Sequence, residues 1–133
     1  MIRQLIATAS AQCGFDERTA GQVAMAVDEA ICNIHRHGYG GKIGKVTIDV
    51  KTSISPSPNI EIRISDEAVQ VDTVSIKSRE LDEIKPGGLG VHLIRTVMDD
   101  AHWSKREHRG MSLIMKKTFI VQIQNQSELH QHE

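Results

Sequence analysis

Three polar side chains recur at intervals of four within the chain: Glu29, Asn33 and His37. On an α-helix this spacing places them along one flank, where they point in a common direction. An amide one turn from a carboxylate suits a site in which the amide oxygen ligates a hard cation such as Mg2+ and the carboxylate orients or deprotonates a hydroxyl group. The same row also fits a solvated helix flank, because Glu and Asn are common on exposed faces. Taken alone, it leaves both interpretations open.

A second candidate is the segment KPGGLGVHLIRTVMDD, residues 85–100, in which three glycines lead into a helical pattern. Unpaired backbone N–H groups and the helix dipole favour a bound phosphate at such a start. The run lacks the Gly-Lys-Ser/Thr ending of a Walker motif, and its glycines are too closely spaced for a dinucleotide-binding motif. A flexible glycine loop explains the run equally well.

The third candidate is Asp66, which ends an alternating apolar pattern over residues 60–65. A carboxylate at the end of a strand can accept a hydrogen bond from an exocyclic amine at the floor of a pocket. Asp is also a common turn former in this position, so it proves nothing by itself.

The elements that position these residues follow from the apolar periodicity. Three-and-four spacing predicts a helix over 2–13, a second from an N-cap at Asp16 to Gly38, and a third that begins in the glycines and ends at Asp99. Alternation with a period of two predicts strands over 45–51, 60–65, 101–107 and 111–117, which form two hairpins. Residues 67–86 show neither period and are expected to be a mobile lid.

Composition excludes several classes of partner. Sixteen basic and seventeen acidic residues give a net charge of -1, and aromatic residues make up only 3%. Neither an electrostatic field nor stacking platforms for nucleic acid are therefore expected. The first twenty residues lack the apolar run of a signal peptide or membrane span, so we expect a cytoplasmic protein without a membrane partner. The two cysteines have no metal-ligand or redox spacing.

The order of these features resembles one family. AVDEAICNIHRHGYG is similar to the N-box of the GHKL (HATPase) ATPases, in the form found in RsbW and SpoIIAB-type anti-sigma-factor serine kinases. ISDEAVQVD resembles their Asp-centred G1 box, PGGLGVHLIRTVMDD their G2 box, and GMSLIMKK their last strand. The combination is more specific than any single box.

The resemblance implies a fold and a set of site residues. The fold would be a single Bergerat-type domain, an α+β two-layer sandwich with helices on one face of a mixed sheet, with a core over about 3–117 and a polar tail over about 119–133. ATP or ADP would be the ligand, with Mg2+. The implied site consists of Glu29 as catalytic base, Asn33 as metal ligand, Asp66 on the adenine amine, Gly87, Gly88, Leu89, Gly90 and Val91 on the phosphates, His37 and Ala68 beside the nucleotide, and Ser112 supporting the base.

By the same resemblance, the protein would phosphorylate a serine of a STAS-domain, anti-anti-sigma partner and would hold a sigma factor or another regulatory client. A homodimer is also implied by the resemblance alone. A different hypothesis is a nucleotide-gated binding module without significant kinase activity. A third, the ATPase domain of a two-component histidine kinase, would require a phospho-accepting helical region for which these 133 residues leave no room.

The sequence departs from the family pattern at two points. Ala68 stands where the G1 box normally has glycine, whose missing side chain gives the backbone freedom and clearance. This replacement is what favours the binding-module hypothesis, whereas the presence of both Glu29 and Asn33 favours the kinase. Family members also usually begin with a strand before the first helix, whereas this chain begins almost at the helix.

Overall fold

The computed structural model describes residues 1–74, 76 and 90–120. Two helices come first, α1 (Ile2–Cys13) and α2 (Glu17–Asn33), and a π-helical turn, η1 (Ile34–Gly38), continues α2. The remaining elements are β1 (Val46–Ser53), β2 (Asn59–Asp66), α4 (Gly90–Val97), β3 (Asp100–Lys105) and β4 (Met111–Thr118). The predicted helices and strands are therefore present wherever they fall on described residues.

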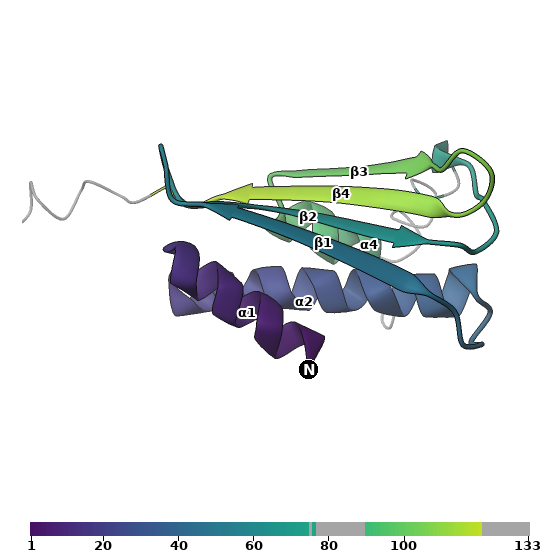
Figure 1. Ribbon diagram of the computed structural model, residues 1–133, viewed down its shortest axis with the longest axis horizontal. Helices are drawn as coiled ribbons and strands as arrows, with labels where there is room; N and C mark the ends of the chain where they lie inside the picture. The colour runs from purple at the N-terminus through teal and green to yellow at the C-terminus, as the bar shows by residue number, and fades with distance from the viewer. Residues whose placement is uncertain (75, 77–89, 121–133) are drawn as a thin grey trace, which may run out of the picture.

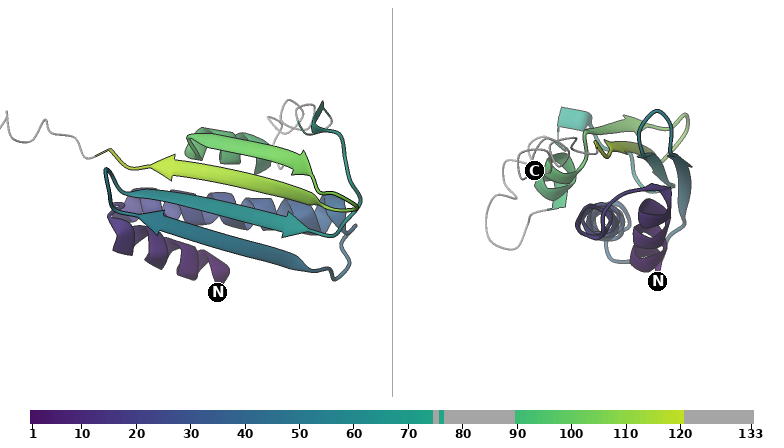
Figure 2. Two further views of the ribbon diagram at one scale, coloured as in Figure 1. Left: turned by 45° about the horizontal axis from the view of Figure 1, so that its top comes forward. Right: turned by 90° about the vertical axis from the view of Figure 1, so that its left-hand side faces the viewer.

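Helices and sheet form two layers. The helices α1, α2 and α4 lie on the same face of the sheet, as the two views of Figure 2 make clear (Figures 1 and 2). The opposite face carries no element from the described residues. This arrangement confirms the two-layer α+β sandwich. Within the described part of the chain, no helix combines the length and apolarity needed to cross a membrane.

The strand order is β1-β2-β4-β3, and every neighbouring pair is antiparallel. β2 and β3 run in the same direction, but β4 lies between them, so the crossover that contains α4 creates no parallel pair. The described strands consequently form an antiparallel sheet, where the family resemblance implied a mixed one. The reason lies in the closing hairpin, because β4 returns into the gap between β2 and β3.

The hydrophobic core lies between the helices α1, α2 and α4 and the inner face of the sheet, mainly that of the two central strands. Side chains alternate along β2 and β4, so every second residue faces the helices. The buried residues with the least exposure include Ile62, Ile64, Met115, Val23, Val27 and Ile94. β1 differs because it is an edge strand: Val46 and Ile48 are only half-buried, and Val50 is 37% exposed. The buried face predicted for this strand is therefore only partly covered.

Some predictions concern residues outside the described ranges. These include most of the lid expected over 67–86, the phosphate candidates Gly87, Gly88 and Leu89, and positions 121–133 of the tail. The first tail residue is part of the packed domain, since the ring of Phe119 lies 5.6 Å from that of Phe15 and its N–H donates to the Pro58 carbonyl at 2.8 Å.

The N-cap of α2 provides a first test of the fold. The Asp16 carboxylate accepts a hydrogen bond from the Thr19 N–H at 2.7 Å, and hydrogen bonding with Thr19 lowers the pKa of Asp16 below its ordinary value. We expect Asp16→Ala to lower the melting temperature, because a helix N–H loses its partner, whereas Asp16→Asn retains the cap. A carboxyl group whose pKa is lower in the folded than in the unfolded protein stabilises the folded state at pH values above its unfolded-state pKa. This stabilisation is lost as the pH falls through the folded-state pKa. Thermal melts between pH 7 and acid should therefore show the difference between wild type and Asp16→Ala shrinking toward low pH; a difference that grows instead would contradict the cap.

Candidate functional site

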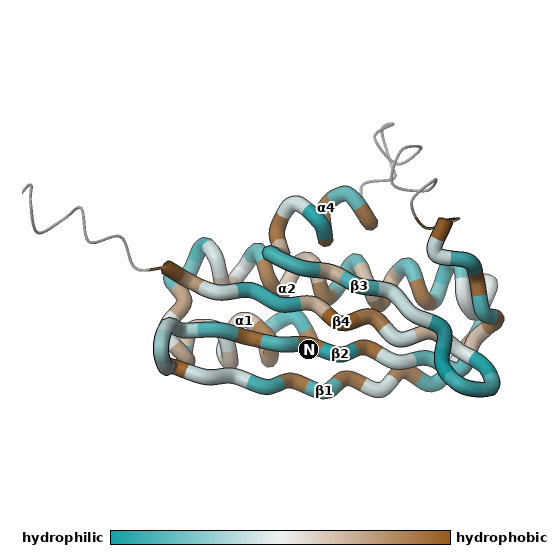
Figure 3. The backbone as a smooth tube through the Cα atoms, turned by 90° about the horizontal axis from the view of Figure 1, so that it is seen from above, coloured by the Kyte–Doolittle hydropathy of each residue, from teal (hydrophilic) through white to brown (hydrophobic). Residues whose placement is uncertain are grey.

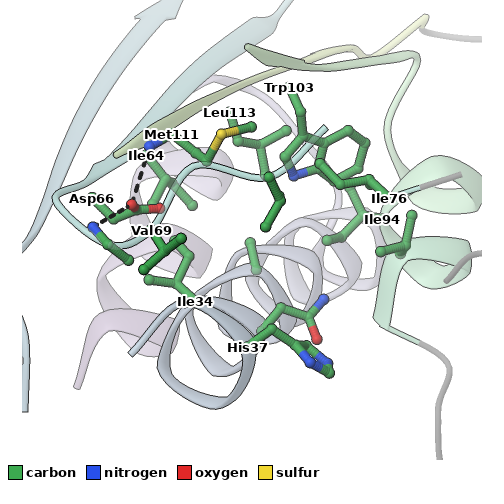
Figure 4. Close-up of a pocket in the computed structure, with 16 residues that line it drawn as sticks. Ile34, His37, Ile64, Asp66, Val69, Ile76, Ile94, Trp103, Met111 and Leu113 are labelled. Carbon is green, nitrogen blue, oxygen red and sulfur yellow. Dashed lines mark hydrogen bonds between the residues drawn. The ribbon is translucent and has the colours of Figure 1, made fainter. Parts of the chain in front are cut away.

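A pocket opens between the C-terminal end of α2, η1, α4 and the inner face of the sheet (Figure 4). Its lining residues are Ala30, Asn33, Ile34, His37, Gly38, Ile64, Asp66, Ala68, Val69, Val71, Ile76, Val91, Ile94, Trp103, Met111 and Leu113. The walls are mainly apolar, with a small number of polar groups that converge on the interior. This combination is typical of a small-molecule site.

Asp66 is the buried acid of this pocket. It is 4% exposed and lies at the end of β2, as the sequence predicted. The backbone N–H groups of Ala68 and Met111 donate to Oδ1 at 2.9 and 3.1 Å. Figure 4 shows Oδ1 held between these two amides while the other carboxylate oxygen faces the pocket interior. The carboxylate is thus fixed and has one acceptor oxygen directed into the pocket.

The chain passes very close to Asp66 at the turn between β3 and β4. Gly110 has a φ of 85°, and a Cβ there would lie 2.0 Å from the Asp66 carbonyl oxygen. Only glycine fits such an approach, for reasons of both conformation and space. Gly110 therefore permits the Met111 N–H to reach the carboxylate.

Tyr39, just after η1, holds the loop that follows Asp66 from the helix side. Its hydroxyl accepts a hydrogen bond from the Glu67 N–H at 2.9 Å and donates to the Lys45 carbonyl. Its ring lies against Gly44, where a Cβ would meet ring atoms at 2.3 Å. Sequence reasoning missed this residue, although a tyrosine among glycines in HGYGGKIGK is a usable signal.

Ala68 fits its position in the loop. Among the described residues other than glycine none has a positive φ, so the backbone at Ala68 does not require glycine. Its methyl group is buried beside Gly38, where an added Cβ would be only 3.0 Å away. The absence of a side chain at Gly38 therefore provides the room that the methyl group occupies.

Asn33 faces the pocket from the last turn of α2. Its Oδ1 is buried, and no hydrogen-bond donor among the described residues reaches it. A buried polar atom without a partner is costly, and it is expected where a ligand completes the site. Gly90, the first residue of α4, packs directly against this amide, since a Cβ there would lie 2.6 Å from Nδ2 and 2.9 Å from Oδ1. Helix α4 thus begins beside the unsatisfied oxygen.

The predicted polar row is only partly brought together. Asn33 and His37 line the pocket, and Figure 4 shows His37 on its helical wall. Glu29 is half-buried on α2 and does not line the pocket. A step of four residues turns about 40° beyond one full helical turn, so the row drifts around the helix. The π turn changes the spacing again after Asn33, as the hydrogen bond from Tyr39 N–H to the Ile34 carbonyl shows.

Ser112 lies on the opposite face of the sheet from the pocket. Its neighbours Met111 and Leu113 line the pocket, and strand alternation directs Ser112 outward. There its hydroxyl lies 3.5 Å from that of Ser65, its partner in the register. Hydropathy alternates along the strands in the same way (Figure 3). The expectation that Ser112 supports the base from within the pocket is therefore not met.

Of the glycine-run candidates that are described, Val91 lines the pocket and Gly90 adjoins Asn33. The apolar walls of the pocket, among them Ile64, Leu113 and Trp103, were not among the site residues expected from the sequence. The alternation of apolar residues that predicted the strands also includes these wall residues, but alternation alone does not distinguish a pocket wall from a hydrophobic core.

The Arg95 guanidinium lies over the ring of Trp103, 5.0 Å from the ring centroid, and this cation–π contact links α4 to β3.

A family model described as a histidine kinase-like ATPase domain matches residues 1–117. The chain belongs to this family. The serine-protein kinase RsbW of Bacillus cereus is 30% identical over 125 residues, which cover 88% of this chain and 75% of that protein. The anti-sigma F factor of Clostridium acetobutylicum is 30% identical over 103 residues, covering 74% and 70% respectively. The family resemblance stated from the sequence is thereby confirmed.

Solved structures agree on the fold. The histidine kinase domain of the Erythrobacter litoralis EL346 blue-light activated histidine kinase aligns with a TM-score of 0.50 at 15% identity, over 76% of this chain and 48% of that domain's chain. The blue-light activated histidine kinase itself aligns with a TM-score of 0.51 at 15% identity, over 77% of this chain and 31% of the kinase. At this identity the likeness concerns the histidine kinase-like ATPase fold alone.

Gly110 and Gly40 form a matched pair for testing the close approach at Asp66. Both have positive φ values, 85° and 61°, so alanine at either position costs about 1–2 kcal/mol in backbone energy. Only at Gly110 would the new Cβ also meet the backbone, because no atom lies within 4 Å of a Cβ at Gly40. We expect Gly110→Ala to lower the free energy of unfolding by about 2 kcal/mol more than Gly40→Ala, as measured by urea denaturation. Equal losses would mean that the turn does not approach Asp66 in solution.

Proposed function

We propose that this chain is an ATP-dependent protein-serine kinase that phosphorylates a STAS-domain partner and sequesters a sigma factor or another regulatory client. The observation that carries the proposal is the buried Oδ1 of Asn33, which has no donor among the described residues and lies in the pocket that also contains Asp66. Membership of an ATPase-domain family and the names of the relatives, serine-protein kinase and anti-sigma F factor, support it.

The base of ATP fits the end of the pocket that contains Asp66. The carboxylate, held through Oδ1, accepts a hydrogen bond from the exocyclic amine of adenine. Apolar side chains such as Ile64, Met111 and Leu113 provide surfaces for the faces of the ring. A site that fixes one acceptor in an otherwise apolar wall selects for a base that donates there, because any other group leaves the second oxygen of the carboxylate without a donor.

The other end of the pocket fits a metal-bound phosphate chain. Asn33 provides an amide oxygen, the type of ligand that Mg2+ accepts, and Gly90 leaves the room that this amide occupies. When bound, Mg2+ neutralises charge on the transferring phosphoryl group. The N-terminus of α4, with Val91 on the pocket wall, lies on the same side. Gly87, Gly88 and Leu89 remain proposed phosphate contacts.

Glu29 is the proposed base for the serine hydroxyl. It lies one turn before Asn33 on α2, and as a carboxylate it is able to accept the hydroxyl proton while the serine oxygen attacks the γ-phosphorus atom of ATP. The bond from that phosphorus to the oxygen bridging the β- and γ-phosphates breaks in the same step, and ADP is the leaving group. Glu29 does not line the pocket, so in this proposal it acts from beside the nucleotide and not in contact with the base. Such a position suits contact with a second protein that brings the hydroxyl to the site.

The second candidate function is a nucleotide-gated binding module without significant kinase activity. The position of Glu29 outside the pocket favours it, since a module of this kind needs Asp66 and Asn33 for the nucleotide but no base. Both functions share the nucleotide site and differ only in phosphoryl transfer.

Substitution of Asn33 tests the metal end of the site. We expect ATP with Mg2+ to raise the melting temperature of the wild type, because a ligand that binds only the folded state stabilises it by about 2.7 kcal/mol at one hundred times its dissociation constant. In Asn33→Ala the Mg2+-dependent part of the shift should be lost, and Gly90→Ala should have a similar effect by displacing the amide. Cys32→Ser, an exposed neighbour on the same helix, serves as control. A full Mg2+-dependent shift in Asn33→Ala would remove Asn33 as the ligand.

Substitution of Glu29 separates the two functions. We expect Glu29→Gln to reduce phosphoryl transfer to a STAS-domain substrate by about a hundredfold or more, while the thermal shift with ADP and Mg2+ is retained. Asp28→Asn, which alters the adjacent carboxylate, should leave transfer nearly unchanged. Full transfer by Glu29→Gln would show that another group is the base. If the wild type binds ATP but modifies no serine in a panel of STAS-domain proteins, the binding module becomes the better description.

A further inference from the structure

Outside the pocket, the β3–β4 turn is tied to the loop that follows Asp66. Nη1 of Arg106 donates to the Asp66 carbonyl at 2.6 Å. Nε2 of Gln70 donates to the Arg106 carbonyl at 2.6 Å and to the Gly110 carbonyl at 3.3 Å. The turn itself is closed by the Arg106 N–H, which donates to the Gly110 carbonyl at 3.0 Å. Neither Arg106 nor Gln70 lines the pocket.

These contacts act on Asp66 from two directions. The Met111 N–H, at the C-terminal end of the turn, holds the Asp66 side chain through Oδ1. The Arg106 guanidinium, at the N-terminal end of the same turn, holds the Asp66 main chain through its carbonyl. Gln70 bonds to both ends of the turn, so it fixes the separation of Arg106 and Gly110. The orientation of the carboxylate is therefore set by the turn and not by β2 alone.

We propose that Arg106 and Gln70 are positioning residues for base recognition by Asp66. The proposal rests on the proposed function, in which Asp66 accepts a hydrogen bond from adenine. Hydrogen bonds weaken steeply as their angle departs from linearity, so a carboxylate free to rotate accepts the amine less well. Arg106 and Gln70 touch neither base nor phosphate; they act by keeping Asp66 in place.

The test compares two nucleotides that differ only in the group that Asp66 reads. ATP carries the exocyclic amine, and the triphosphate of purine riboside carries hydrogen in its place. Trp103, the single tryptophan of the chain, lines the pocket, and its fluorescence reports binding of either nucleotide with Mg2+. The measured quantity is the ratio of the two dissociation constants.

In the wild type, ATP should bind more tightly than the purine analogue. Arg106→Ala should reduce that preference by about threefold to tenfold, the range for one hydrogen bond, through weaker ATP binding and with little change for the analogue. Gln70→Glu, which replaces the donor with an oxygen facing two carbonyls, should act in the same direction. Arg106→Lys, which keeps a donor, should restore part of the preference.

Arg109→Ala is the matched control. Arg109 belongs to the same turn, but it pairs with Glu67 at 3.5 Å with its side chain 73% exposed, and the preference for ATP should remain unchanged. If Arg106→Ala and Gln70→Glu weaken both nucleotides equally, or fail to fold, these residues support the fold alone and the proposal is overturned. If the wild type itself shows no preference for ATP over the analogue, Asp66 does not recognise the base, and the proposed function fails at this point. The wild-type measurement therefore distinguishes a failure of the proposed function from a failure of the positioning role.

Discussion

A buried carboxylate must be hydrogen-bonded, and meeting this requirement at Asp66 organises the nucleotide end of the domain. Asp66 is 4% exposed, and the two N–H groups that donate to Oδ1 come from segments far apart in sequence, at Ala68 and Met111. The pairing joins the end of β2 to the start of β4. It also requires the backbone to pass so close to Asp66 that only glycine is accommodated at position 110. One polar group thus fixes a loop, a turn and the edge of the pocket.

The other end of the pocket depends on the packing of two helices. α4 lies against α2, and Gly90 at the start of α4 packs against the amide of Asn33. The absence of a side chain at Gly90 leaves room for this buried amide, whose oxygen has no donor among the described residues, an unfavourable state that a bound ligand would relieve. The cation–π contact between Arg95 and Trp103 attaches α4 to β3. The position of α4 is therefore determined by contacts with both the helical layer and the sheet. The site is consequently assembled from helices that the sheet holds in place.

The loop that follows Asp66 is held by packing as well as by hydrogen bonds. Ala68 replaces the usual glycine, and Gly38 opposite has no side chain, so the methyl group fills space instead of producing a clash. Gln70 and Arg106 add bonds between the loop and the β3–β4 turn. These hydrogen bonds hold the loop that contains Ala68 against the β3–β4 turn, at the end of the pocket that contains Asp66.

Local features of the sequence determined most of the fold. The apolar periods gave the helices and strands close to their observed ends, because amphipathic spacing and capping at Asp16 act within a few residues. The boxes identified the family and placed Asp66, Asn33, His37 and Val91 at the pocket.

What only the tertiary structure decided depends on the order and register of elements distant in sequence. Register turned Ser112 to the outer face, helical drift left Glu29 beside the pocket, and β4 entered between β2 and β3 to make the sheet antiparallel. The bonds of Arg106, Gln70 and Tyr39 to the loop after Asp66 belong to the same class, because they join residues that only the folded backbone brings together.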